Sequence, residues 1–202
     1  YIGEFIFYNK DFAIVERSRG MEILKNRIIK DGVVIGDRIL KVDSFLNHQL
    51  DVGLFNEIGK EFKNRFKNKN ISKILTVETS GIGIACIVAQ YFGNIPVVFA
   101  KKHSGINMDT DNYESNVHSF TKETDYVIKV SKKYINDEDN VLIIDDFLAS
   151  GSAMSGLIDI CKQAGTTIQG VGIVIEKSFQ GGRELIEKEE IQLESLAIVE
   201  DI

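Results

Sequence analysis

Two adjacent carboxylates, Asp145 and Asp146, follow the apolar run 141–144, and a stretch of small residues begins shortly after them. The small residues are Ala149, Ser150, Gly151, Ser152 and Ala153. Small side chains let a phosphate approach the backbone, and the N–H groups at the start of a helix supply donors for it. Carboxylates repel a phosphate but accept hydrogen bonds from vicinal hydroxyls. Taken alone, Asp145 would merely end a strand and Asp146 would cap a helix, but the full run predicts a site for a ribose 5-phosphate.

The elements around this run predict how it is positioned. Short runs rich in Val and Ile alternate with helical stretches, and we expect strands at 73–78, 96–101, 141–146 and 168–177, the last of these being the final long apolar strand. One helix is expected between the first two strands, and another, closed by Gly165, between the last two. Strands that are apolar on both faces and alternate with helices predict an α/β fold with a mainly parallel, twisted sheet. Ligands of such sheets bind at the carboxyl ends of the strands, where the acidic pair lies.

The remaining segments are less regular. An amphipathic helix begins at Met21, and the polar, aperiodic stretch 103–116 predicts a long loop. Alternating apolar and polar residues at 117–122 and 125–131 predict an antiparallel hairpin at the sheet edge. We expect residues 21–202 to form one domain and residues 1–20 to be an extension of uncertain origin, appended upstream of Met21 or natural.

Composition excludes several classes of protein. The 202 residues include 30 acidic and 24 basic side chains, for a formal net charge of −6, so a purely electrostatic grip on nucleic acid is not expected. No apolar run approaches the ~18–20 residues of a membrane span. Cys86 and Cys161 form no CxxC motif, and the three histidines (His48, His103 and His118) lack metal-ligand spacing. We therefore expect a cytoplasmic protein without disulfides, a protein metal site, or a nucleic-acid or membrane partner.

Five separated segments carry a family resemblance: GVVIGDRILKVDSFLNHQ (32–49), VETSGI (77–82), PVVFAKKH (96–103), VLIIDDFLASGSA (141–153) and GIVIEKSFQ (172–180). With them the chain resembles the type I phosphoribosyltransferases, most closely the bacterial members that act on xanthine, over residues 21–198. The resemblance implies the type I fold, with a small N-terminal hood and a flexible loop at 103–116. One departure concerns the phosphate loop, where Ser150-Gly151-Ser152-Ala153 replaces the common Thr-Gly-Gly-Thr and loses the final threonine hydroxyl.

The resemblance also implies roles for individual residues. The turn of Glu78, Thr79, Ser80 and Gly81 would face pyrophosphate, although a plain strand-to-helix turn reads the same. Lys101 and Lys102 would project from a strand end toward the same cleft; otherwise they are solvated charges. Lys177 would donate to the 6-oxo group of a purine, and Leu40 and Asn47 of the hood would contact the base. Phe147 would stack on the base or belong to the core.

The implied reaction transfers phosphoribosyl from 5-phosphoribosyl 1-diphosphate to N9 of xanthine, giving xanthosine 5′-monophosphate and pyrophosphate in purine salvage. Magnesium would arrive with the diphosphate, and the protein would be a homodimer. One alternative is a relative that prefers guanine or hypoxanthine. Another is a non-catalytic transcription regulator that senses the diphosphate sugar, which would need a DNA-binding module larger than residues 1–20 can form.

Overall fold

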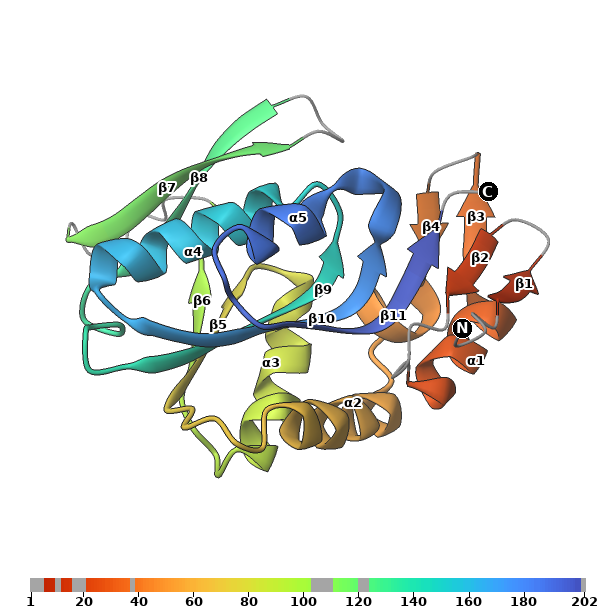
Figure 1. The fold of residues 1–202 in the computed structure, drawn as a ribbon, viewed down its shortest axis with the longest axis horizontal. Coiled ribbons are helices and arrows are strands. Elements are labelled where there is room, and N and C mark those ends of the chain that lie inside the picture. Colours follow the sequence, from red (N-terminus) through yellow and green to blue (C-terminus); the bar gives the residue numbers. More distant parts are fainter. Residues whose placement is uncertain are drawn as a thin grey trace.

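A computed structural model of the chain describes residues 6–9, 12–15, 21–36, 39–102, 111–119 and 124–200. Its centre is a sheet with the strand order β1-β2-β11-β10-β9-β5-β6 (Figure 1). Neighbouring strands from β11 to β6 run parallel, whereas β1 and β2 pair antiparallel at the β11 edge. The strands are β1 (Ile6–Asn9), β2 (Phe12–Val15), β5 (Lys73–Val77), β6 (Val97–Ala100), β9 (Asn140–Leu148), β10 (Thr167–Lys177) and β11 (Leu193–Glu200). The predicted α/β class with a mainly parallel sheet is confirmed.

Helices cover both faces of this sheet. The helices α2 (Val52–Arg65) and α3 (Ser80–Tyr91) lie on one face, and α4 (Ser152–Ala164) and α5 (Gly182–Glu187) lie on the other (Figure 1). The buried apolar residues of the helix α1 (Glu22–Asp31) belong to the same cluster as those of α2 and α3. The helix at 52–65 was not predicted from the sequence, and the expected final strand, β10, is followed by another strand, β11.

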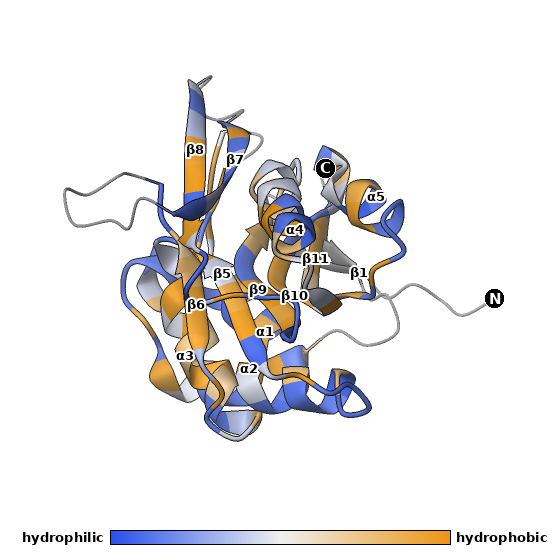
Figure 2. Ribbon diagram, turned by 90° about the vertical axis from the view of Figure 1, so that its left-hand side faces the viewer, coloured by the Kyte–Doolittle hydropathy of each residue, from blue (hydrophilic) through white to orange (hydrophobic). Residues whose placement is uncertain are grey.

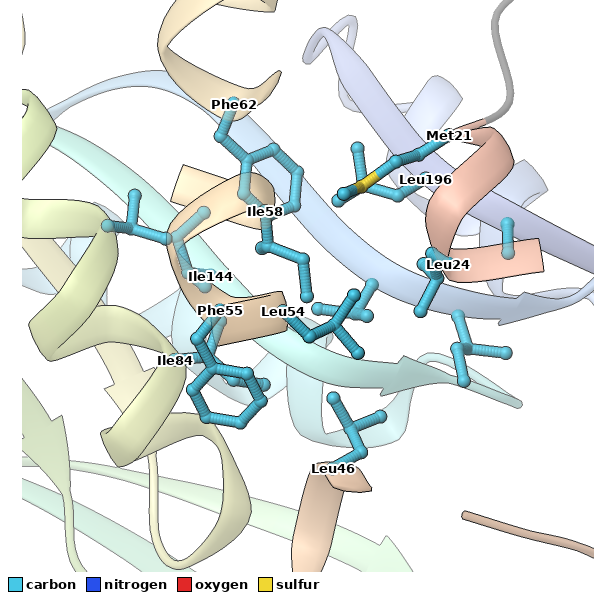
Figure 3. Close-up of a cluster of buried hydrophobic side chains, with 14 of the residues drawn as sticks. Met21, Leu24, Leu46, Leu54, Phe55, Ile58, Phe62, Ile84, Ile144 and Leu196 are labelled. Carbon is cyan, nitrogen blue, oxygen red and sulfur yellow. The ribbon is translucent and has the colours of Figure 1, made fainter. Parts of the chain in front are cut away.

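Two layers of apolar side chains hold the sheet between the helices. On one side, α2 contributes Phe55, Ile58 and Phe62, which belong to one cluster with Leu24 of α1, Ile84 of α3 and Ile144 of β9 (Figure 3). On the other side, residues of α4 such as Leu157 pack on the strands. The strands at the centre of the sheet are coloured mostly as hydrophobic in Figure 2 because both of their faces are covered. None of the helices in the described ranges is long and apolar enough to cross a membrane.

The predicted hairpin is confirmed, but it begins earlier than expected. The strands β7 (Asn112–Ser119) and β8 (Thr124–Ser131) pair antiparallel as a separate two-stranded sheet. Backbone hydrogen bonds of 3.0 Å in both directions between Lys101 and Lys129 connect this hairpin to the end of β6. The loop expected at 103–116 therefore gives way to a strand at Asn112, and residues 103–110 lie outside the described residues. The first half of β7 was not predicted as a strand because one side of it faces solvent and carries polar residues.

Residues 32–36 and 39–47 form the small hood. The short strands β3 (Val33–Ile35) and β4 (Ile39–Lys41) pair antiparallel, and a π-helix follows over Asp43–Asn47. Phe45 and Leu46 of the π-helix are buried in the same apolar cluster as α1 and α2. The hood is therefore fixed to the body of the protein by packing, which holds Asn47 in a defined place.

Candidate active site

The acidic pair lies inside β9 rather than at its end. The strand continues to Leu148, so the expectation that the two carboxylates terminate it is wrong. Parallel pairing of β9 with β10 extends to Leu148 and keeps this backbone in ladder geometry. The N–H of Asp146 donates to Oδ1 of Asp145, and the N–H of Phe147 donates to Oδ1 of Asp146, both at 3.0 Å. One oxygen of each carboxylate therefore accepts a hydrogen bond from the backbone N–H of the next residue.

Both carboxyls sit in an environment that disfavours their charge. Burial raises the pKa of Asp145 well above its ordinary value, and the neighbouring charge of Asp146 raises it further, while Lys102 opposes the shift. Burial also raises the pKa of Asp146, against hydrogen bonds that include one from Ser80. Only 6% of the Asp145 surface is exposed. Asp145 is buried and Asp146 is partly buried, and hydrogen-bond donors of a ligand would stabilise their charged forms.

The predicted pyrophosphate turn packs directly on this pair. It connects β5 to α3, and its Glu78–Thr79 peptide is cis. A Cβ atom added to Gly81 would lie 2.1 Å from Oγ1 of Thr76 and 3.0 Å from Oδ1 of Asp145, so only glycine fits there. The Thr76 hydroxyl is buried and has no hydrogen-bond partner among the described residues. The turn and Asp145 of the acidic pair are therefore in direct contact.

The small residues after β9 form the loop that leads into α4. Gly151 has φ = 83° and serves as the N-cap of the helix, a conformation that favours glycine. The hydroxyl oxygens of Ser150 and Ser152 lie 3.0 Å apart, and the first N–H groups of α4 have no side-chain cap. A pocket of about 160 Å³ is lined by Ala149–Met154, Asp145, Phe147, Leu148, His118, Tyr126 and Gln180. The structure thus brings Asp145 and all five predicted loop residues to one pocket.

Five residues of this pocket were not predicted as site residues: His118, Tyr126, Leu148, Met154 and Gln180. Tyr126 and His118 come from the hairpin, and His118 contacts Asp125 at 2.6 Å. His118 is exposed and lines the pocket. Gln180 follows β10 and ends the segment GIVIEKSFQ, whose family resemblance could have indicated it as a site residue.

The two lysines after β6 do not share a cleft. Lys102 lies near the acidic pair: its Nζ is 5.4 Å from the centroid of the Tyr126 ring, and its backbone N–H donates to Glu78. Lys101 instead lines a separate hollow of about 570 Å³, formed by β6 and the hairpin. The expectation that both project toward one cleft is therefore wrong for Lys101, because successive residues of an extended strand point in opposite directions.

The predicted base contacts fall into two groups. Lys177 ends β10, and its Nζ is 5.4 Å from the centroid of the Phe147 ring on the neighbouring strand β9. Burial lowers the pKa of Lys177. In the hood, Oδ1 of Asn47 is buried and has no hydrogen-bond partner among the described residues. Leu40 is 8% exposed and packs within the apolar cluster, so its contact with a base stays a prediction.

The described residues hold no group of three or more His, Cys, Asp or Glu side chains that could bind a metal ion. The arrangement is instead suited to an anionic sugar. Backbone N–H donors at the start of α4 lie near the carboxylate pair, which also contacts the turn at Gly81. At the ends of β9 and β10, the ammonium group of Lys177 lies over the ring of Phe147.

Comparisons with known proteins agree with this geometry. Residues 42–195 match the family model described as the phosphoribosyl transferase domain. The chain is 71% identical to the xanthine phosphoribosyltransferase of Clostridium tetani over 179 residues, which is 89% of this chain and 94% of that protein. It is 58% identical to the enzyme of the same name from Clostridioides difficile, over 90% of this chain and 96% of that protein.

Solved structures share the fold at low sequence identity. The adenine phosphoribosyltransferase of Giardia lamblia matches with a TM-score of 0.74 and 21% identity, over 89% of this chain and 98% of that one. That of Trypanosoma brucei matches with a TM-score of 0.73 and 15% identity, over 96% of this chain and 86% of that one. The fold thus has counterparts among solved structures, and the family model and the close relatives show that the chain belongs to the phosphoribosyl transferase family.

Proposed function

We propose that the protein is a purine-salvage enzyme that transfers phosphoribosyl from 5-phosphoribosyl 1-diphosphate to N9 of xanthine. The observation that carries the proposal is the acidic pair of buried Asp145 and partly buried Asp146, which is followed, after the loop 149–151, by a helix start without a side-chain cap. The relatives from Clostridium tetani and Clostridioides difficile, which carry the name xanthine phosphoribosyltransferase, support the choice of base.

In this proposal each part of the sugar has its own partner. The ribose hydroxyls donate to the carboxylates of Asp145 and Asp146. The 5-phosphate accepts from the backbone N–H groups of Ala149–Ala153, at the positive end of α4. The diphosphate faces the turn 78–81 and Lys102, and magnesium arrives bound to that diphosphate as part of the substrate.

The reaction breaks the bond between C1 of the ribose and the diphosphate oxygen, and it forms the bond between C1 and N9 of the base. The bonding electrons leave with pyrophosphate, and the N9 proton leaves the base. A transition state with positive charge on the ribose gains from carboxylates held nearby and from a fixed geometry. The chain supplies position and charge; no covalent attachment of the sugar to a side chain is required.

Base choice would be set at the strand ends and in the hood. In this proposal the ammonium of Lys177 donates to the 6-oxo group, and the purine ring stacks on Phe147, whose ring centroid is 5.4 Å from Nζ of Lys177. Asn47 would read position 2, where xanthine has a carbonyl, guanine an amine and hypoxanthine only hydrogen.

Steady-state kinetics with four bases test this function. We expect kcat/KM to be highest with xanthine, lower with guanine and hypoxanthine, and lowest with adenine, because the 6-amino group of adenine would face a donor. Adenine as the preferred base, or no transfer to any purine, would overturn the proposal.

We further propose that the enzyme is a homodimer that acts in the cytoplasm. The proposal rests on the family resemblance and on the large hollow beside β6, where Phe99 is 37% exposed and a second copy of the chain could pack. Sedimentation at micromolar concentration should give twice the mass of one chain, and a monomer would contradict it.

A further inference from the structure

We propose that Arg183, through an ion pair with Glu176, is a positioning residue that holds residues 177–182 against both the base end and the phosphate end of the active site. The inference rests on the proposed function. Neither residue lines the pocket at the phosphate loop, and neither was singled out from the sequence.

The ion pair is buried on the Glu176 side and closely bonded. Glu176 is 1% exposed, and its Oε1 accepts from Nε of Arg183 at 2.8 Å while its Oε2 accepts from Nη2 at 2.6 Å. The hydroxyl of Ser195 on β11 also donates to Oε2. The bidentate geometry fixes the plane of the guanidinium as well as its distance, which a single contact would not do.

The pair encloses a short segment whose two ends touch different parts of the site. Glu176 precedes Lys177, the proposed base contact. Arg183 follows Gly182, whose N–H donates to the carbonyl of Ala149 at 3.0 Å. Gln180, between them, lines the pocket with Asp145. The ion pair therefore fixes both ends of the same segment.

Contact at the phosphate end is tight enough to transmit a displacement. A Cβ atom added to Gly182 would lie 2.4 Å from the carbonyl oxygen of Ala149, and one added to Gly151 would lie 3.0 Å from Cα of Gly182. The backbone of α5 thus packs on the backbone of the phosphate loop with no intervening side chain. A shift of Gly182 would move that loop directly.

The helix α5 needs such an anchor. It has six residues, which is too short for a helix to be stable by its own hydrogen bonds. Ile186 is buried beneath it, but apolar contact does not fix register as a bidentate pair does. Without the pair, Lys177 and Gly182 lose the constraint on their separation, so affinity for base and for sugar phosphate should fall together.

The test compares Arg183→Gln and Arg183→Lys with a control arginine. A double variant, Glu176→Gln/Arg183→Gln, covers the case in which a lone buried Glu176 prevents folding, because two amides can bond without charge. The control is Arg65→Gln. Arg65 is also nearly buried and pairs with Glu61 and Glu194, but it lies on α2. It also donates to the backbone carbonyl of Ser195, so this control perturbs the same part of β11 while keeping both partners of the Glu176–Arg183 pair.

The readouts are Tm, kcat, the KM for xanthine and for the diphosphate sugar, and the affinity for ribose 5-phosphate by calorimetry. In Arg183→Gln and in the double variant we expect both KM values to rise about ten-fold and ribose 5-phosphate affinity to fall similarly, with Arg183→Lys intermediate. Arg65→Gln should lower Tm and leave both KM values within two-fold of the wild type.

KM values and ribose 5-phosphate affinity that stay within two-fold in the folded Arg183 variants would overturn the positioning role. A rise in only one of the two KM values would also overturn it, because the pair would then not serve both ends. Absence of xanthine transfer by the wild type would instead count against the proposed function, and the ribose 5-phosphate measurement would still decide the role of Arg183.

Discussion

Asp145 and Asp146 on β9 and Glu176 on the neighbouring strand β10 differ in how their charges are compensated. Glu176 is matched by a bidentate guanidinium and a serine hydroxyl within the protein. Asp145 and Asp146 are adjacent like charges whose pKa values are both raised by burial. In the parallel register, Glu176 pairs with Leu148, so the two groups lie close along the sheet.

This difference distinguishes a carboxylate that stabilises the fold from two carboxylates that are available to a ligand. A compensated buried charge fixes geometry, whereas an uncompensated one costs stability that a bound ligand can restore. The contrast predicts that removing charge from Asp145 or Asp146 damages function and spares the fold. Removing charge from Glu176 should leave the guanidinium of Arg183 without its main partner and weaken the fold.

The largest effect is expected from Asp145→Asn/Asp146→Asn. Loss of both charges removes the strong acceptors for the ribose hydroxyls, so kcat/KM for the diphosphate sugar should fall about 10³-fold, or roughly 4 kcal/mol. Steady-state kinetics measure the loss, and circular dichroism checks that the fold survives. Kinetics equal to the wild type would remove the ribose assignment.

A smaller loss is expected from Lys177→Ala, which alters the segment next to Glu176. Removing the donor to the 6-oxo group should lower kcat/KM for xanthine, guanine and hypoxanthine alike by about 10²-fold, or roughly 2.7 kcal/mol. Competition assays with the three bases measure it. If only one base were affected, Lys177 would not be the common reader of that oxygen.

Asn47→Ala tests the hood, whose unpartnered amide oxygen parallels the uncompensated state of the acidic pair. We expect the ratio of kcat/KM for xanthine over guanine to fall about ten-fold, which is roughly 1.4 kcal/mol. The use of hypoxanthine, which carries no group at position 2, serves as the internal control. An unchanged ratio would show that Asn47 does not read position 2.

The smallest effect is a gain in stability. Because burial raises the folded-state pKa of Asp145, the folded state favours the proton that the unfolded state has lost at neutral pH. This group therefore lowers stability as pH rises above the unfolded pKa of about 3.9. Asp145→Asn should raise Tm at pH 7 by about 2–4 °C, for roughly 1 kcal/mol, with the gain shrinking toward pH 4.

The control for this stability measurement is Glu176→Gln, which should lower Tm at pH 7. The two variants make the same chemical change at neighbouring strands, so opposite signs isolate the effect of compensation. Equal signs would mean that the pairing of Glu176 with Arg183 does not distinguish the two groups.

Much of the fold was predictable because burial on both faces gives continuous apolar runs. The strands β5, β9 and β10 and the helix α4 with its terminal Gly165 have such signals. The strand β11 was not predicted because Glu194 and Ser195 interrupt its apolar pattern. The first half of β7 escaped for a related reason: it lies in a hairpin with polar positions on one side.

The site was predictable where its residues are adjacent in the chain, as in the run 145–153. It was less so where distant segments meet. Lys101 and Lys102 look equivalent in the sequence, but Lys101 lines the hollow beside β6, whereas Lys102 lies over the Tyr126 ring, because successive residues of a strand point in opposite directions. The partner of Glu176 depends on α5 folding back over the end of β10, and no local spacing encodes that return.

The central claim is that Asp145 and Asp146 are left uncompensated in order to bind the ribose diol. Calorimetry with xanthosine 5′-monophosphate and its 2′,3′-dideoxy analogue tests it most directly, in the wild type and in Asp145→Asn/Asp146→Asn. We predict that the wild type binds the natural nucleotide about 10²-fold more tightly than the analogue, and that this ratio falls below about five-fold in the double variant. A ratio that is equally large in both proteins would contradict the account.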